Sequence, residues 1–268
     1  MDPERLVTHS RLIADLTRLG LAPGQTVMLH ASVKAIGWIV GGPDRVLEAI
    51  LEVLGPEGTL MMLASWEDNP YELPGWPQEV QQAWLDEGPA YDPASSRADR
   101  REMGILTEYL RTRPGAVRSR HPFSYVALGR LATHLTGDQP WQYRDGHGSP
   151  LAKLCAAGGK VLLLGSPLTN VTLLHHAEFL ARVPDKRIDR YRMPVLIDDE
   201  KNWMDFEEFD TTSGIVDWPE DYFETIVKAY LEEDPGLIGR VGYGHAHLFD
   251  AADLCRFAVE WMELHFNP

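Results

Sequence analysis

The sequence predicts an α/β fold, with a mixed central sheet flanked by helices in a single domain over residues 1–268. Three observations predict it. Short apolar runs of strand length alternate with segments whose apolar residues recur at helical spacing. The connections between these segments are short and contain glycine and proline. The chain carries no internal repeat, low-complexity tract or linker at which it would divide.

The N-terminal segment sets out this alternation. Apolar residues at helical spacing predict a helix over 8–19 that ends at Gly20. An apolar strand is predicted over 26–30, and Asp44 caps a helix further along. A second apolar strand is predicted over 59–64. Strand, helix and strand joined by short turns are typical of an α/β sheet.

Residues 66–100 differ from the rest of the chain. They carry five prolines and three tryptophans, so we expect a long loop without a long regular element. Long loops in compact domains often bind ligands. The aromatic side chains are compatible with a wall for a substrate and equally with a small core of the loop itself.

The remaining chain continues the alternation to its C-terminal end. A hairpin is predicted over 193–206, which favours a mixed sheet. The other predicted elements are strands over 124–128 and 161–164, a helical turn over 132–135, and helices over 103–111, 149–154, 171–181, 221–231 and 251–265.

The charge balance constrains the partners. Against 25 Lys and Arg stand 40 Asp and Glu, a net charge of −15, which disfavours nucleic acid and favours cationic ligands. No apolar run is long enough for a membrane helix and the N-terminus does not resemble a signal peptide, so we expect a cytoplasmic protein, monomeric or homodimeric. Cys155 and Cys255 lie in no metal or redox motif, which indicates free thiols.

His175 is the first candidate for chemistry. An apolar strand ends at Gly165, and the helix that carries His175 begins a few residues later. Ligands of α/β sheets bind beyond the carboxyl ends of strands, near helix N-termini. A packed histidine without catalytic role is the alternative on the pattern alone. The adjacent His176 points to a different helix face.

Three further segments are candidates. An acidic segment over 204–210 alternates, so that Glu208 and Asp210 share one face; it could orient an imidazole and bind an amine, or be a solvated charge run. The basic segment 118–124 is suited to phosphate, or is an exposed turn. Residues 30–37 follow a strand and could present amides to a cofactor, or be an ordinary connection. No glycine-rich phosphate motif is present.

A metal hydrolase is the alternative from another class. His245 and His247 alternate as a chelating pair on a strand would. A catalytic zinc site needs a third ligand, and no partner at a recognised spacing follows, so we expect no metal.

The ordered set of short segments resembles the antibiotic N-acetyltransferase family, in particular the aminoglycoside 3-N-acetyltransferases. The resemblance covers nearly the whole chain. The segments that carry it are 30–37, 55–59, 64–66, 69–72, 91–93, 118–122, 148–150, 172–178 and 250–254.

The resemblance implies the antibiotic N-acetyltransferase fold, distinct from the common GNAT fold, and a specific reaction. Acetyl-CoA is the implied donor, and the 3-amino group of a 2-deoxystreptamine aminoglycoside is the implied acceptor, so that the antibiotic is inactivated. His175 is the implied general base, with Glu208 as its catalytic carboxylate, although whether Glu208 or Asp210 orients the ring stays open. An amine must lose a proton before it attacks the thioester, which suits histidine.

The resemblance and the charge also assign binding roles. Substrate ammonium groups are expected at Asp68, Glu72, Glu178 and Asp210. Acetyl-CoA is expected at Ser32, Val33, Lys34, Gly104, Arg118, Ser119, His121 and Ser124.

The segments 211–214 and 73–90 depart from the family pattern, which leaves the antibiotic range undetermined. An acyltransferase acting on another amine, and a binder without chemistry, are the remaining alternatives.

Overall fold

A mixed seven-stranded sheet forms the centre of the computed structural model, which describes residues 3–219, 221–233 and 237–267. Its strand order is β10-β11-β7-β2-β4-β6-β5, with β7, β2 and β4 parallel and the other neighbours antiparallel. The prediction of an α/β fold with a mixed sheet is confirmed. The strands are β2 (Thr26–Ala31), β4 (Thr59–Leu63), β5 (Val117–Arg118), β6 (Tyr125–Gly129), β7 (Lys160–Leu164), β10 (Leu237–Val241) and β11 (Gly244–Asp250).

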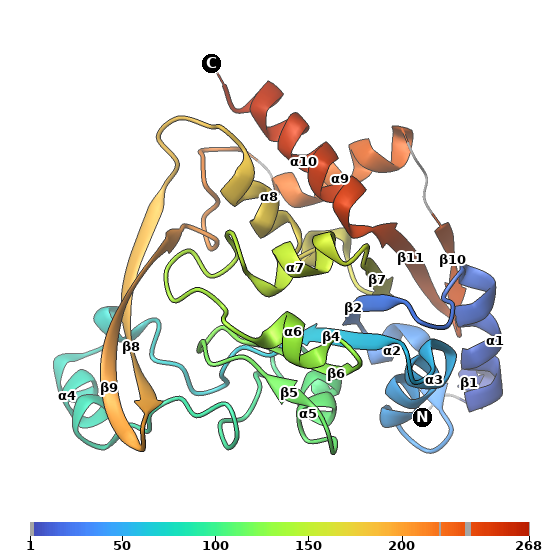
Figure 1. Ribbon diagram of the computed structural model, residues 1–268, viewed down its shortest axis with the longest axis horizontal. Helices are drawn as coiled ribbons and strands as arrows, with labels where there is room; N and C mark the ends of the chain where they lie inside the picture. Colours follow the sequence, from blue (N-terminus) through green and yellow to red (C-terminus); the bar gives the residue numbers. More distant parts are fainter. Residues whose placement is uncertain (1–2, 220, 234–236, 268) are drawn as a thin grey trace.

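Helices cover both faces of this sheet because successive side chains of each strand point to opposite sides (Figure 1). In β2, Met28 packs into one core, whereas Val27 and Leu29 pack into the other. The first core is closed by α6 (Ala132–Thr136), α7 (Pro150–Ala156), α8 (Leu174–Leu180), α9 (Tyr222–Glu233) and α10 (Ala251–His265). The second is closed by α1 (His9–Leu19), α2 (Val33–Ile36), α3 (Asp44–Leu54) and α5 (Ile105–Arg111).

Local signals fix several helix ends where the sequence predicts them. The Thr8 hydroxyl accepts a hydrogen bond from the Arg11 amide at the start of α1, and Gly20 ends that helix in the left-handed conformation, φ 106°. Asp250 caps α10, which spans the predicted residues. The α3 cap differs from the prediction, because Asp44 is the first helical residue and Pro43 occupies the cap position.

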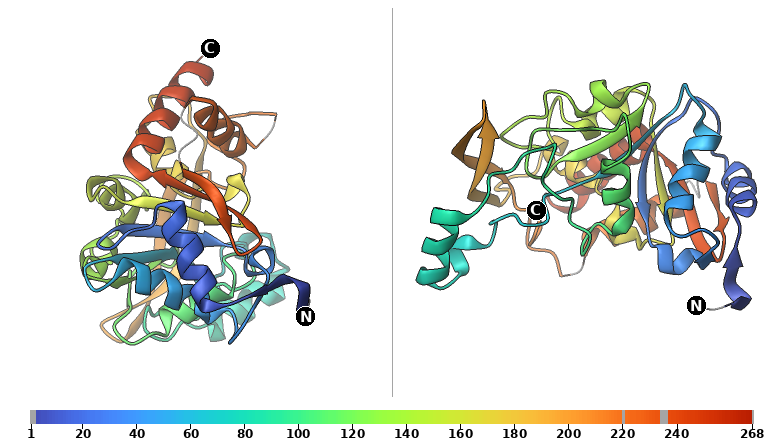
Figure 2. Two further views of the ribbon diagram at one scale, coloured as in Figure 1. Left: turned by 90° about the vertical axis from the view of Figure 1, so that its right-hand side faces the viewer. Right: turned by 90° about the horizontal axis from the view of Figure 1, so that it is seen from below.

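The hairpin of β8 (Ile188–Ile197) and β9 (Glu200–Phe209) forms a separate two-stranded sheet. The expectation that it contributes to the mixed sheet is therefore wrong, and the hairpin is also longer than the sequence indicates. It lies at the end of the molecule opposite α1, beside the 66–100 segment (Figures 1 and 2). A third small core joins the two, with Trp66 and Tyr91 packed against residues of the hairpin.

The 66–100 segment contains a regular element that we did not predict. Helix α4 (Gln78–Glu87) begins directly after Pro77. A proline at a helix start costs nothing, because the first amides of a helix have no intrahelical acceptor. Trp84 of α4 packs edge-on against Trp66 and Trp203, with ring centroids 6.1 Å apart in both pairs. These aromatic side chains thus build a core of their own.

Some elements escape the sequence patterns altogether. The strands β10 and β11, the short pair β1 (Leu6–Val7) and β3 (Trp38–Ile39), and β5 are among them. Helix α8 begins later than predicted, after the 3-10 turn η3 (Leu168–Asn170); two further 3-10 turns are η1 (Pro3–Arg5) and η2 (Leu73–Gly75). Within the described ranges, no helix has the length and apolar character needed to cross a bilayer.

Candidate active site

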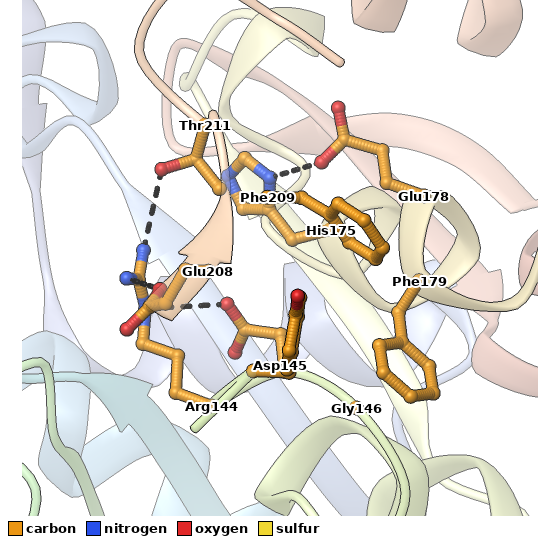
Figure 3. Close-up of a pocket in the computed structure, with 10 residues that line it drawn as sticks. Arg144, Asp145, Gly146, His175, Glu178, Phe179, Glu208, Phe209 and Thr211 are labelled. Carbon is orange, nitrogen blue, oxygen red and sulfur yellow. Dashed lines mark hydrogen bonds and ion pairs between the residues drawn. The ribbon is translucent and has the colours of Figure 1, made fainter. Parts of the chain in front are cut away.

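A histidine–carboxylate pair occupies one turn of α8 (Figure 3). The Nδ1 atom of His175 lies 2.7 Å from Oε2 of Glu178, three residues further along the helix. Residues at this spacing share a helix face. The Glu178 side chain is 2% exposed and that of His175 is 20% exposed. Because a carboxylate oxygen faces Nδ1, that nitrogen carries a proton, and the unprotonated Nε2 on the other side of the ring is free to act as a base.

The second oxygen of Glu178 also has a donor. The hydroxyl of Tyr222, at the start of α9, donates to Oε1 of Glu178 and accepts a hydrogen bond of 3.0 Å from the amide of Ile215. Burial and the neighbouring Glu178 carboxylate raise the pKa of Tyr222 well above its usual range, so the hydroxyl keeps its proton. Lys186 donates to the backbone carbonyl of Glu178 at 2.6 Å. The two carboxylate oxygens of Glu178 are thus held by different side chains, Oε2 by His175 and Oε1 by Tyr222.

Glu208 and Asp210 are not the partners of the imidazole, which corrects our expectation for them. The predicted alternation holds, since Glu208 faces inward from β9 and is 3% exposed. Its oxygens, however, accept from Arg144 and from the Tyr191 hydroxyl. Asp210 accepts from two backbone amides just after it, at 2.8 and 2.9 Å, and so shapes a turn.

His121 belongs to the same buried cluster as Glu208. Its Nδ1 accepts from the amide of Phe123 at 3.0 Å, so the ring proton of the neutral form is on Nε2. That nitrogen is buried without a hydrogen-bond partner and lies 3.7 Å from Oε1 of Glu208. Burial, and then the charge of Arg144, hold the pKa of His121 well below its usual value, so the ring is neutral.

Arg118, Ser119 and Ser124 of the basic segment are also used inside the fold, which corrects their expected place beside the cofactor. Arg118 donates to Ser124 at 2.8 Å and to backbone carbonyls, and its guanidinium lies over the ring of Tyr91. Ser119 donates to Gln139 at 2.5 Å. Ser119 and Ser124 are fully buried. These side chains hold strands and the 66–100 segment together, and none of them lines the cleft at His175.

A large cleft opens beside the pair, with a volume of about 770 Å³. Ser32, Val33 and Lys34 line it at the carboxyl end of β2, and Gly104 and Arg101 line it as well. This edge of the sheet is where ligands of α/β proteins bind. The cleft ends at His175 and Phe223, whose ring centroids are 4.9 Å apart.

A second space of about 350 Å³ also reaches His175 and shares Thr169 and Phe223 with the large cleft. His175, Glu178 and the turn from Thr211 to Gly214 line it, and Asp221 adds a carboxylate. The imidazole therefore borders both of these spaces, one at the strand ends and one beside the loop that follows the hairpin. It also lines the smaller space drawn in Figure 3, together with Arg144, Asp145 and Glu208.

A third space, of about 530 Å³, lies between the 66–100 segment and the hairpin. Glu72 and Asp189 line it, with Tyr71, whose hydroxyl donates to Asp189. Asp68 is exposed and lines none of the three spaces. Burial, and then the charges of Asp99 and Glu72, raise the pKa of Glu102, which lines the large cleft.

The histidines considered for a metal are on β11, which lies between β10 and β7 in the sheet. His245 is exposed, and His247 stacks on Phe249 with ring centroids 5.7 Å apart. In the part of the chain that the structure describes, no group of three or more His, Cys, Asp or Glu side chains is arranged to hold a metal ion.

Comparison with known proteins identifies the family. The family model described as aminoglycoside 3-N-acetyltransferase matches residues 28–263. The chain belongs to this family. An aminoglycoside N(3)-acetyltransferase VII from Streptomyces paromomycinus is 49% identical over 265 residues, which covers 96% of this chain and 92% of the relative.

Solved aminoglycoside 3-N-acetyltransferases share the fold. Aminoglycoside acetyltransferase AAC(3)-Xa is 45% identical, with a TM-score of 0.94 and coverage of 98% of this chain and 96% of that chain. AAC-IIIb in a binary structure with CoASH is 44% identical, with a TM-score of 0.91 and coverage of 98% of both chains. Sisomicin-bound AAC-VIa is 34% identical, with a TM-score of 0.91 and coverage of 97% and 99%.

In this aminoglycoside 3-N-acetyltransferase family member, the contacts of two residues near His175 differ from those expected from the sequence. Glu178 was assigned to substrate binding, although its position three residues after His175 was the available signal for a pair on one helix face. Nothing in the sequence indicates that Tyr222 contacts Glu178, because the two residues are 44 positions apart and meet only through the packing of the fold.

Proposed function

We propose that this protein transfers the acetyl group of acetyl-CoA to the 3-amino group of a 2-deoxystreptamine aminoglycoside, with His175 as the general base. The observation that carries the proposal is the position of the His175–Glu178 pair, whose imidazole borders both a large cleft at the strand ends and a second space beside the loop that follows the hairpin. A base at such a junction can act where two substrates meet. Relatives described as aminoglycoside N(3)-acetyltransferases support the reaction.

The chemistry follows from the protonation state of the pair. Nε2 of His175 takes a proton from the acceptor amine, and the Glu178 carboxylate stabilises the imidazolium that results. The amine nitrogen then attacks the thioester carbonyl carbon with its free electron pair. When the tetrahedral species collapses, the carbon–sulfur bond breaks and the imidazolium returns its proton to the departing sulfur. The nitrogen, which became positively charged on attack, releases its remaining extra proton to solvent and is left as the neutral amide. No acetylated side chain is needed.

The donor fits the larger cleft. Its volume of about 770 Å³ lies within the range of small-molecule and cofactor sites. Ser32, Val33, Lys34 and Gly104 line it, and the side chains of Lys34 and Arg101 add positive charge that would meet phosphate groups. Arg100 lines it too, but its guanidinium is paired with Glu67 at 3.1 Å. The AAC-IIIb binary structure with CoASH supports a CoA thioester as the donor. Ser32, whose side chain makes no helix-capping hydrogen bond, is our candidate donor to the developing oxyanion.

The acceptor fits the spaces beside the hairpin and beside the loop that follows it. We retain Glu72 and Asp210 from the predicted set and add Asp189 and Asp221. Glu72, Asp189 and Asp221 line these spaces, and Asp210 directly precedes the turn that lines one of them. Their carboxylates, with the net charge of −15, would attract the ammonium groups that do not react. Sisomicin-bound AAC-VIa supports an aminoglycoside as the acceptor. Glu178 is reassigned from ammonium binding to His175, and Asp68 is set aside.

The test is a thiol-release assay. The protein is incubated with acetyl-CoA and a panel of 2-deoxystreptamine aminoglycosides, and free CoA is followed with a thiol reagent while the product is identified by mass spectrometry. We expect acetylation at the 3-amino group and a loss of antibiotic potency. An absence of thiol release with every member of the panel refutes the proposal. Release with a different amine alone indicates an acyltransferase on that acceptor. We also propose that the chain acts as one domain in the cytoplasm, where acetyl-CoA is available.

A further inference from the structure

Tyr222 occupies a junction between the catalytic pair and the acceptor space. It is 6% exposed and follows Asp221 at the start of α9. Its hydroxyl donates to Oε1 of Glu178, the oxygen that does not face His175. The same hydroxyl accepts from the amide of Ile215 at 3.0 Å. Both hydrogen-bonding capacities of this phenol are therefore used inside the protein.

The loop that follows the hairpin rests on the same side chain. Gly214 has φ 83°, and a Cβ atom at this position would lie 2.7 Å from the Tyr222 ring. A glycine is required here, because any side chain would both strain the backbone and clash with the ring. The loop from Thr211 to Gly214 lines the space that we propose for the acceptor. Tyr222 thus contacts the wall of that space with its ring and the catalytic carboxylate with its hydroxyl.

A hydrogen bond to Glu178 alters what the carboxylate does for His175. The Tyr222 proton draws electron density to Oε1 and stabilises the carboxylate form of Glu178. A carboxylate that accepts such a bond attracts an imidazolium less strongly than one without it, and it is also held in one orientation. The 2.7 Å contact between Oε2 and Nδ1 depends on that orientation.

We propose that Tyr222 is a positioning residue that sets the basicity of His175 through Glu178. The proposal rests on the proposed function where it is tested by enzyme kinetics, but not where it is tested by an NMR titration of His175. Tyr222 contacts the carboxylate and not the imidazole, so it acts on the reaction only through Glu178.

Other charged groups also surround His175, and they limit how much of its basicity depends on the Tyr222 hydroxyl. They lie in the 144–145 loop, on β9, at the start of α9 and along the large cleft, and Lys186 donates to the backbone carbonyl of Glu178. These groups are Arg144, Asp145, Glu208, Asp221, Lys34, Arg100, Arg101, Glu102 and Lys186. All of them remain when the Tyr222 hydroxyl alone is removed, so a change in the titration of His175 reports on that hydroxyl.

The first experiment compares Tyr222→Phe with Tyr230→Phe. Tyr230 is on the same helix, is 3% exposed and donates to a carboxylate of Asp253 at 2.9 Å, so its variant is a matched control away from the pair. We expect Tyr222→Phe to lower kcat about 10-fold, with KM for both substrates within about two-fold. The acid limb of the kcat/KM profile should move up by about 0.5–1 pH unit. Tyr230→Phe should leave kcat and the acid limb of the kcat/KM profile unchanged.

A double-mutant cycle separates positioning from packing. In a Glu178→Gln background, Tyr222→Phe should have no further effect on kcat, because the group through which it acts has been changed. An undiminished effect in that background overturns the proposal and assigns Tyr222 to the packing of the loop. A rise in KM for the aminoglycoside at unchanged kcat overturns it as well.

A second variant and a second readout keep the proposal testable. If Tyr222→Phe does not fold, Tyr222 is replaced by 3,5-difluorotyrosine, which keeps the shape of the side chain and is a stronger hydrogen-bond donor. If the protein acetylates none of the aminoglycosides, ¹⁵N NMR follows the titration of the His175 ring in each variant without substrates. We expect the titration midpoint to fall with difluorotyrosine and to rise with Tyr222→Phe. A midpoint unchanged in difluorotyrosine protein overturns the proposal, whereas absent thiol release with a shifted midpoint refutes only the proposed function.

Discussion

Replacing Glu208 by alanine tests whether this carboxylate stabilises the fold or takes part in the chemistry. Glu208 is 3% exposed and accepts from Arg144 and Tyr191. Removing one partner of a buried ion pair costs about 3–5 kcal/mol. Arg144 keeps a second carboxylate, Asp145 at 3.3 Å, so we expect the lower end, about 3 kcal/mol. For a chain of this size, that corresponds to a midpoint of thermal unfolding about 6–12 °C lower.

The assay pairs thermal unfolding by circular dichroism with kcat measured well below both midpoints. Glu207→Ala is the control, because Glu207 lies on the outer face of β9 and pairs at 2.7 Å with an exposed Arg190. A surface pair of this kind contributes at most about 1 kcal/mol. We expect Glu208→Ala to lose stability and to keep kcat within about 10-fold. An unchanged midpoint with a 100-fold lower kcat would refute our reasoning and place Glu208 in the reaction.

Three further predictions concern the cleft. His175→Ala should lower kcat by about two to four orders of magnitude in the thiol-release assay, and near-normal turnover would contradict its role as base. Lys34→Ala should raise KM for acetyl-CoA about 5- to 10-fold at unchanged kcat; an equal loss in kcat would mean that Lys34 contributes mainly in the transition state. Burial lowers the pKa of His30 from 6.5 to about 4. The unfolded chain therefore binds this proton first, and stability is lost as the pH falls from about 6.5 towards 4. Unfolding midpoints of His30→Leu should depend less on pH in that window, and an equal dependence would contradict the assignment.

Periodic patterns predicted the elements in which apolar residues recur with the period of a helix or a strand along their whole length. Helix α10 and the strands β2, β4 and β7 lie where the sequence places them, because their apolar residues face the two cores in register. Helix α4 was missed because it buries no residue completely and because prolines surround it. β10 and β11 were missed because glycine and histidine interrupt their apolar alternation.

The candidate site was predictable only where its residues are close in sequence. His175 and the segment from Ser32 to Lys34 reach the cleft as expected. The partner of His175 was sought on β9, 33 or more positions away, whereas the helix supplies it from three positions away. The buried position of Glu208 depends on Arg144, which no local pattern connects with β9. Long-range charge pairing of this kind has no signature in a single sequence.

The placement of His175 and Glu178 on one helical turn has a consequence for how the range of accepted antibiotics can change. Their mutual geometry is inherited from the backbone of α8 and is complete before either substrate arrives. The wall proposed for the acceptor comes from other parts of the chain, namely the β8–β9 hairpin, the loop after it and the 66–100 segment. Selection can therefore remodel the proposed acceptor wall in small steps while the proposed proton-transfer pair is left intact.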